Sequence, residues 1–190
     1  MNLTVAGLAI GIALLSAGFA RAQEPAQQLL RGIYQELVEI DTSDATGNTT
    51  RAAEAMAARL RAGGIPAADI HVIVPPGGAK KGNLVARLRG SGAKKPLLLL
   101  AHIDTVNAKR EDWQRDPFKL IEENGYFYAR GSSDDKAMAA ALVAIMIELK
   151  QQNVRLNRDL ILALTADEED RKSTRLNSSH TDISRMPSSA

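Results

Sequence analysis

Cysteine is absent from the 190 residues, and aromatic side chains make up only 4% of them. Without cysteine no disulfide can hold the fold, so its stability must come from an apolar core or from a metal. So few aromatic rings argue against a surface that stacks the bases of single-stranded nucleic acid. Hydrophobic residues reach 45% and charged residues 24%. These values are typical of globular proteins, and the length suits one domain.

A large excess of charge of one sign is also missing from most of the chain. The formal net charge is +2, yet residues 23–169 carry 19 Lys and Arg against 20 Asp and Glu. The surplus of basic residues therefore comes from the two ends. A nearly neutral body gives no reason to expect a nucleic-acid partner or an anionic membrane surface.

Residues 1–22 have the pattern of a secretory signal peptide. Their apolar run from Leu3 to Ala20 is followed by Ala20-Arg21-Ala22, which has small residues at the two recognition positions. We expect cleavage after Ala22, a periplasmic or secreted location and no stable membrane insertion. An uncleaved anchor is the alternative, because the run approaches the length of a membrane span and no Lys or Arg precedes it.

Residues 23–169 alternate between helical and extended patterns, which predicts an α/β sheet flanked by helices. Helices are expected over 25–41, 51–64 and 136–151, the second of them opened by Asn48 or Thr49 as cap. Strands are expected over 69–75 and 82–90, which form a hairpin, and over 95–106 and 158–169, with a short strand or hairpin over 125–136. The apolar run at 95–106 indicates a strand buried on both faces. Helix 136–151 is apolar almost all round, so we expect it to be buried as well.

Polar pairs follow the buried strands, at the edge where open α/β sheets place their ligands. They are His102-x-Asp104, Asp134-Asp135 and Glu168-Glu169. In an extended segment residues i and i+2 point to one side, so Asp104 can reach the ring nitrogen of His102 that a metal leaves free. Imidazole together with carboxylates suits zinc, with cobalt or manganese possible.

Each pair alone also has an ordinary explanation. A histidine at the end of a strand is more often a surface residue than a ligand, Asp-Asp before a helix is commonly a cap, and adjacent glutamates are usually a solvated turn. The combination is more specific, because all three pairs fall at one edge of the predicted sheet. Grouping so many carboxylates is costly without a cation.

The segments "LLLLAHIDTV", "W..DPF", "YARGSSDDK" and "TADEE" resemble the co-catalytic zinc metallohydrolases. That family includes glutamate carboxypeptidase, aminoacylase, succinyl-diaminopimelate desuccinylase and carnosine-type dipeptidases. The resemblance implies that His102, Asp134 and Glu169 are metal ligands, Asp134 bridging two zinc ions. It implies further that Asp104 orients His102, that Glu168 is the general base, and that the peptide after Asp134 is cis.

The function implied by this resemblance is hydrolysis of an amide or peptide bond by zinc-activated water. The substrate would be a small peptide or an N-acyl amino acid, and a homodimer is expected only of a full-length parent. A related group, the zinc aminopeptidases, pairs similar residues and is an alternative. A catalytically inactive fragment is another, because such families also contain a lid and dimerisation domain and further zinc ligands that have no counterpart here.

Residues 170–190 read differently from the rest. They are rich in serine and charge, and their back-translation is similar to an adapter of short-read sequencing libraries. We therefore expect a non-native, disordered tail after an N-terminal part of a catalytic domain over 23–169. A natural serine-rich terminus is the alternative. We assign no role to His180, which lacks the strand and acidic neighbours of a ligand.

Overall fold

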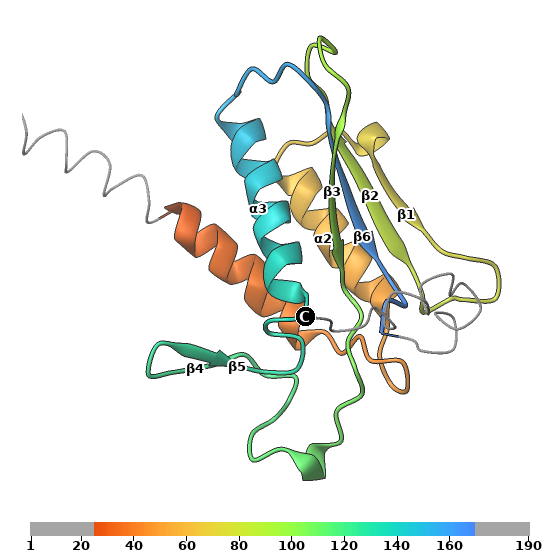
Figure 1. The fold of residues 1–190 in the computed structure, drawn as a ribbon, viewed down its shortest axis with the longest axis vertical. Coiled ribbons are helices and arrows are strands. Elements are labelled where there is room, and N and C mark those ends of the chain that lie inside the picture. The colour runs from red at the N-terminus through yellow and green to blue at the C-terminus, as the bar shows by residue number, and fades with distance from the viewer. Residues whose placement is uncertain (1–24, 170–190) are drawn as a thin grey trace, which may run out of the picture.

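The structure is a computed structural model that describes residues 25–169 (Figure 1). Its helices and strands, in chain order, are a helix over residues 25–39, α2 (Thr49–Ala62), β1 (Ile70–Ile73), β2 (Asn83–Leu88), β3 (Leu97–His102), β4 (Ile121–Glu123), β5 (Tyr126–Tyr128), α3 (Lys136–Gln151) and β6 (Leu160–Thr165), with short 3-10 turns η1 (Ala67–Asp69) and η2 (Arg110–Asp112). The mixed α/β class is confirmed. Strand β4, which pairs with β5 in a separate hairpin, was not predicted.

The main sheet has the strand order β1-β2-β6-β3. Strands β1 and β2 form the predicted antiparallel hairpin, and β2 also runs antiparallel to β6. Strands β3 and β6 are parallel, and the last residue of each, His102 and Thr165, are opposite one another. Parallel pairing therefore brings the carboxyl ends of two strands to one edge of the sheet, where the predicted polar pairs begin.

Helices cover one face of this sheet (Figure 1). Helix α2 packs on β1 and β2, and α3 packs on β3, β6 and α2. Alternate residues of the two central strands point into this layer and are buried: Leu84, Ala86, Leu88, Leu160, Leu162 and Leu164. Each of these leucines contributes about 1.5–3 kcal/mol when fully buried, so this layer is the main source of stability.

Helix α2 shows how the sequence sets one of these contacts. Its buried side chains recur every three or four positions, as an amphipathic helix requires. The side chain of Asn48 accepts a hydrogen bond from Arg51 N at 2.9 Å, so one of the two predicted caps is confirmed. Gly63 ends the helix against α3, where a Cβ would lie 2.7 Å from Cγ1 of Ile147. A larger residue there would push the two helices apart.

The prediction that the strand at 95–106 is buried on both faces is wrong for the described residues. Leu98 and Leu100 are 57% and 58% exposed, because they point away from the helices and β3 pairs only with β6 in the main sheet of residues 25–169. Helix α3 is likewise only partly buried, with Met138 and Ile145 about half exposed. An apolar run predicts a strand that needs other segments packed on its faces, but it does not show whether the described residues provide them.

None of the helices within residues 25–169 is long and apolar enough to cross a membrane. The signal peptide with its cleavage after Ala22, the tail over 170–190 and His180 lie outside the described residues.

Candidate metal centre

Three separate segments meet at the carboxyl edge of β3 and β6. His102 is the last residue of β3, a turn over 166–169 follows β6, and the loop before α3 brings in Asp134. Donor atoms of His102, Glu168 and Glu169 all lie within 4.8 Å of one another. The convergence predicted from the sequence is therefore present, although Glu168, predicted as the general base, lies among these donors together with Glu169.

The imidazole of His102 is held from both sides. Its Nδ1 lies 3.2 Å from the backbone oxygen of Asp104 and 3.4 Å from the Asp104 carboxylate. Its Nε2 lies 3.0 Å from Asp134 Oδ1 and 3.8 Å from Glu168 Oε2. When Nδ1 donates to Asp104, the lone pair of Nε2 faces two carboxylates. That contact is unfavourable unless a proton or a metal cation lies between them.

Asp104 connects the end of β3 to the turn after β6. Its carboxylate is almost fully buried, and Oδ2 accepts a hydrogen bond from Glu169 N at 2.8 Å. The other oxygen, Oδ1, has no hydrogen-bond partner in the part of the chain that the structure describes. Asp104 therefore contacts the ring of His102 and the backbone of Glu169 at once, as expected of a residue that orients ligands.

The loop before α3 places Asp134 over the imidazole. The Asp134–Asp135 peptide is cis, as the resemblance implies. The Asp135 side chain does not cap α3 and instead accepts from His102 N at 3.3 Å. Gly131 turns the loop with φ of 71°, and a Cβ there would lie 2.5 Å from Thr105 Cγ2. Glycine is therefore needed for the loop to approach the segment after β3.

The charges of the site favour a cation. Burial raises the pKa of Glu169, and the neighbouring carboxylates of Asp134 and Glu168 raise it further. Burial disfavours a charge on His102, but the hydrogen bond to Asp134 and the charges of Asp104 and Glu168 outweigh it and raise the pKa of the ring. Crowded carboxylates and an imidazole with perturbed pKa values are the donor set that zinc and similar divalent metals bind. The residues therefore fit such a metal.

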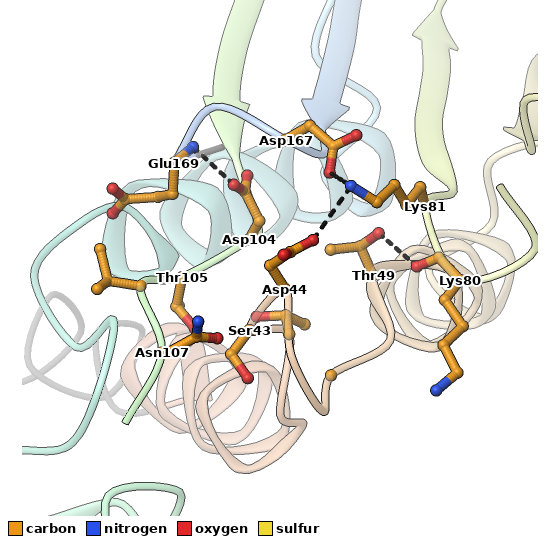
Figure 2. Close-up of a pocket in the computed structure, with 13 residues that line it drawn as sticks. Ser43, Asp44, Thr49, Lys80, Lys81, Asp104, Thr105, Asn107, Asp167 and Glu169 are labelled. Atoms are coloured by element: carbon orange, nitrogen blue, oxygen red, sulfur yellow. Dashed lines mark hydrogen bonds and ion pairs between the residues drawn. The ribbon is translucent and has the colours of Figure 1, made fainter. Parts of the chain in front are cut away.

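A cavity of about 490 Å³ adjoins this cluster (Figure 2). Its walls come from the loop after the first helix with the start of α2, the loop before β2, the segment after β3 and the turn after β6. Asp104 and Glu169 line it on the side of the cluster, and the carboxylates of Asp44 and Asp167 line it as well. The candidate metal centre therefore opens onto a polar space large enough for a small molecule.

Two lysines near the site were not predicted from the sequence: one is buried, and the other forms ion pairs with two aspartates. Lys136, fully buried at the start of α3, donates to Ile40 O at 2.8 Å. Burial lowers its pKa to about 7, although the charges of Asp41 and Asp104 oppose that shift. The "DDK" motif contains Lys136, but only packing shows that its ammonium group points inward.

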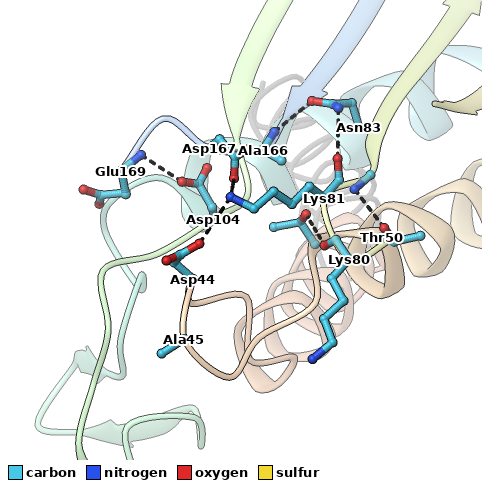
Figure 3. A network of polar contacts seen from close by, with 12 residues as sticks. Asp44, Ala45, Thr50, Lys80, Lys81, Asn83, Asp104, Ala166, Asp167 and Glu169 are labelled. Carbon is cyan, nitrogen blue, oxygen red and sulfur yellow. Dashed lines mark hydrogen bonds and ion pairs between the residues drawn. The ribbon is translucent and has the colours of Figure 1, made fainter. Parts of the chain in front are cut away.

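The second missed lysine, Lys81, forms ion pairs with Asp167 at 2.9 Å and Asp44 at 3.2 Å (Figure 3). The hydrogen bond to Asp167, with that to Asp44, outweighs burial and raises the pKa of Lys81 well above its usual range. Lys81 lies two residues before β2, far in sequence from Asp167. Its place beside Asp167 follows from the antiparallel pairing of β2 with β6, which could have been predicted only as a strand pairing and not from a motif around Lys81.

Known proteins resemble both the sequence and the fold. Residues 98–180 match the model of Peptidase family M20/M25/M40. A probable succinyl-diaminopimelate desuccinylase from Staphylococcus aureus is 42% identical over 91 residues, which are 47% of this chain and 22% of that protein.

Two solved structures share the fold. Human carnosine dipeptidase 1 has a TM-score of 0.67 at 20% identity, over 83% of this chain and 36% of that chain. An M20 family metallo-carboxypeptidase from Sulfolobus solfataricus has a TM-score of 0.63 at 23% identity, over 74% and 31%. The chain thus spans less than a quarter of the curated relative and about a third of each solved chain.

Proposed function

Since this chain carries a domain segment of peptidase family M20/M25/M40, we propose that the whole protein hydrolyses an amide or peptide bond with metal-activated water. The observation that carries the proposal is the cluster at the carboxyl edge of β3 and β6, where donor atoms of an imidazole and two carboxylates lie within 4.8 Å. Family membership supports a metal-dependent hydrolase, and the cluster supplies donors suited to zinc, cobalt or manganese.

Each polar residue of the cluster takes one role in this proposal. His102, Asp134 and Glu169 would hold the zinc ions, and Asp104 would orient His102. When bound, zinc lowers the pKa of a water toward ~7 and polarises the carbonyl under attack. Glu168, whose side chain is 62% exposed, would take a proton from that water as its oxygen adds to the amide carbonyl carbon, and would return the proton to the amine nitrogen as the C–N bond breaks.

The substrate class we propose is a small peptide or an N-acyl amino acid. The match to a probable succinyl-diaminopimelate desuccinylase supports the N-acyl amino acid, since that protein is named for removing an acyl group from an amino acid. The cavity beside Asp104 and Glu169 offers room for a polar molecule of that size.

We propose activity for the whole protein and not for residues 23–190 alone. Leu98 and Leu100 on β3 leave apolar area in water, which further polypeptide would cover in a complete catalytic domain. Export to the periplasm or the medium, with cleavage after Ala22, belongs to the same proposal and rests on residues 1–22. Any homodimer would also belong to the full-length parent.

The test uses the full-length parent protein, loaded with zinc, and a panel of dipeptides and N-acyl amino acids. We expect free amine to be released, and Glu168→Gln to lower kcat by about 10²–10⁴-fold while bound zinc stays unchanged. Glu111→Gln, in the exposed turn η2, is the matched control and should leave kcat unaltered. A parent that binds no metal, or that is equally active with Glu168→Gln, would contradict the proposal.

A further inference from the structure

The turn after β6 decides where the two glutamates of the cluster lie. It contains Asp167, whose φ of 67° lies in the left-handed region. Residues other than glycine are uncommon there, and aspartate is among those that tolerate it best. Because Asp167 directly precedes Glu168 and Glu169, any other backbone conformation at this residue would redirect both carboxylates.

Three side chains from two other segments hold this turn in place (Figure 3). Asn83 accepts a hydrogen bond from Ala166 N at 2.9 Å, and Asp104 accepts from Glu169 N at 2.8 Å. Between these two anchors, Lys81 contacts the carboxylate of Asp167 at 2.9 Å. The backbone is thus fixed at both ends of the turn, and its left-handed residue is held through its side chain.

Lys81 also reaches the loop after the first helix, where it contacts Asp44 at 3.2 Å. Both carboxylates line the cavity beside the cluster, so the ammonium group joins two of its walls (Figure 2). The neighbouring Lys80 does not contact Asp167 through its side chain (Figure 3). Its backbone oxygen accepts from Thr49 of α2, and its side chain extends away from the turn (Figure 3).

We propose that Lys81 is a positioning residue of the metal centre, which holds Asp167 so that the turn presents Glu168 and Glu169 to His102. The inference rests on the proposed function, because it assumes that these glutamates serve a bound metal. Partners that orient metal ligands typically change metal affinity by about 10–100-fold when removed. Lys81 acts through Asp167, two residues before the ligand Glu169, so the lower end of that range applies.

The experiment is a titration of the metal-free full-length parent protein with Co²⁺, followed by the visible absorption of the bound ion. Lys81→Met, which keeps the length of the side chain and removes its charge, should weaken Co²⁺ binding about 10-fold and alter the absorption band. Lys81→Arg should retain most of the affinity, since it preserves the ion pair. Lys80→Met removes the same charge from the adjacent position and should bind as the unaltered parent protein does.

Asp167→Asn provides a second, independent variant, because asparagine tolerates the left-handed conformation but cannot form the ion pair. It should weaken Co²⁺ binding as Lys81→Met does, and it carries the test if Lys81→Met fails to fold. Melting of the metal-free variants separates a loss of stability from a loss of positioning.

Co²⁺ affinities of Lys81→Met and Asp167→Asn equal to that of the unaltered parent protein would overturn the inference and leave the proposed function standing. An equal loss with Lys80→Met would also overturn it, since the effect would then be one of net charge. If the unaltered parent protein bound no Co²⁺, the proposed function would fail, and the inference with it.

Discussion

The two ends of the main sheet use carboxylates in opposite ways. At the end where β3 and β6 begin, Asp159 accepts from Gly90 N at 2.7 Å and from Arg87 Nε at 2.8 Å. The hydrogen bond from Gly90 and the guanidinium of Arg87 lower its pKa. At the end where the same strands finish, burial and neighbouring carboxylates raise the pKa of Glu169.

A second pair at the first end follows the same rule. Arg89 donates to both oxygens of Asp69, at 2.9 and 2.6 Å, and this hydrogen bonding lowers the pKa of Asp69. Two-pronged contacts of this kind fix geometry and are among the stronger ion pairs. Acidic residues at this end are thus matched by arginines, and their role is to hold strands and turns together.

At the opposite end, the carboxylates of residues 25–169 that contact His102 are not paired with arginines in this way. Asp134, Glu168 and Asp104 all lie within 4 Å of its ring nitrogens. Carboxylates placed this close repel one another, so their grouping does not stabilise the fold by itself. The difference teaches that the carboxylates at one end are paired with arginines and serve stability, whereas those at the other end are grouped in a way that fits a bound cation.

Replacing the central imidazole should have the largest effect on this contrast. His102→Ala removes a donor from the cluster, so we expect metal affinity to fall by more than the ~10–100-fold cost of losing an outer partner. Isothermal titration with Zn²⁺ or Co²⁺ measures it. Asp159→Ala is the control at the other end of the sheet and should leave metal affinity unchanged. If His102→Ala bound the metal as tightly as the unaltered protein, the carboxyl end of β3 and β6 would not be a metal site and the contrast between the two ends would be wrong.

The converse substitution should affect stability alone. Asp159→Ala leaves Gly90 N and the guanidinium of Arg87 without their acceptor, so we expect the melting temperature of the metal-free chain to fall by roughly 5 °C. Circular dichroism on heating measures the change. Glu168→Gln at the other end should not lower the melting temperature, because it relieves repulsion. A fall of similar size in both variants would contradict the comparison.

The smallest expected effect is on the acid dependence of folding. Because the pKa values of Asp69 and Asp159 are lowered in the folded chain, the unfolded chain binds more protons as pH falls below about 5. Their contribution to stability is therefore present at neutral pH and lost as pH falls through their folded pKa values. Urea denaturation of the metal-free chain from pH 6 to 3 measures the slope. The double variant Asp69→Asn/Asp159→Asn should flatten it, and an unchanged slope would assign acid sensitivity to other groups.

Local patterns predicted much of the fold. Helix α3 has the predicted bounds, Lys136–Gln151, because its long run of helix formers has no interruption. The β1–β2 hairpin follows from two β-rich runs separated by a Gly- and Pro-rich turn. The site could be predicted because parallel strands share a carboxyl edge, so residues that follow them meet there. Its metal and its catalytic roles stay predictions.

Residue order by itself determined which chemistry lies at that edge, since motifs such as "AHID" and "ADEE" are local and their strands are strongly apolar. Tertiary structure decided what no local pattern records. Pairing of β2 with β6 brought Lys81 to Asp167 across 86 positions, and packing of helices on one face left Leu98 and Leu100 in water. Both outcomes depend on which distant segments pack together, and a run of residues carries no signal of its neighbours in space.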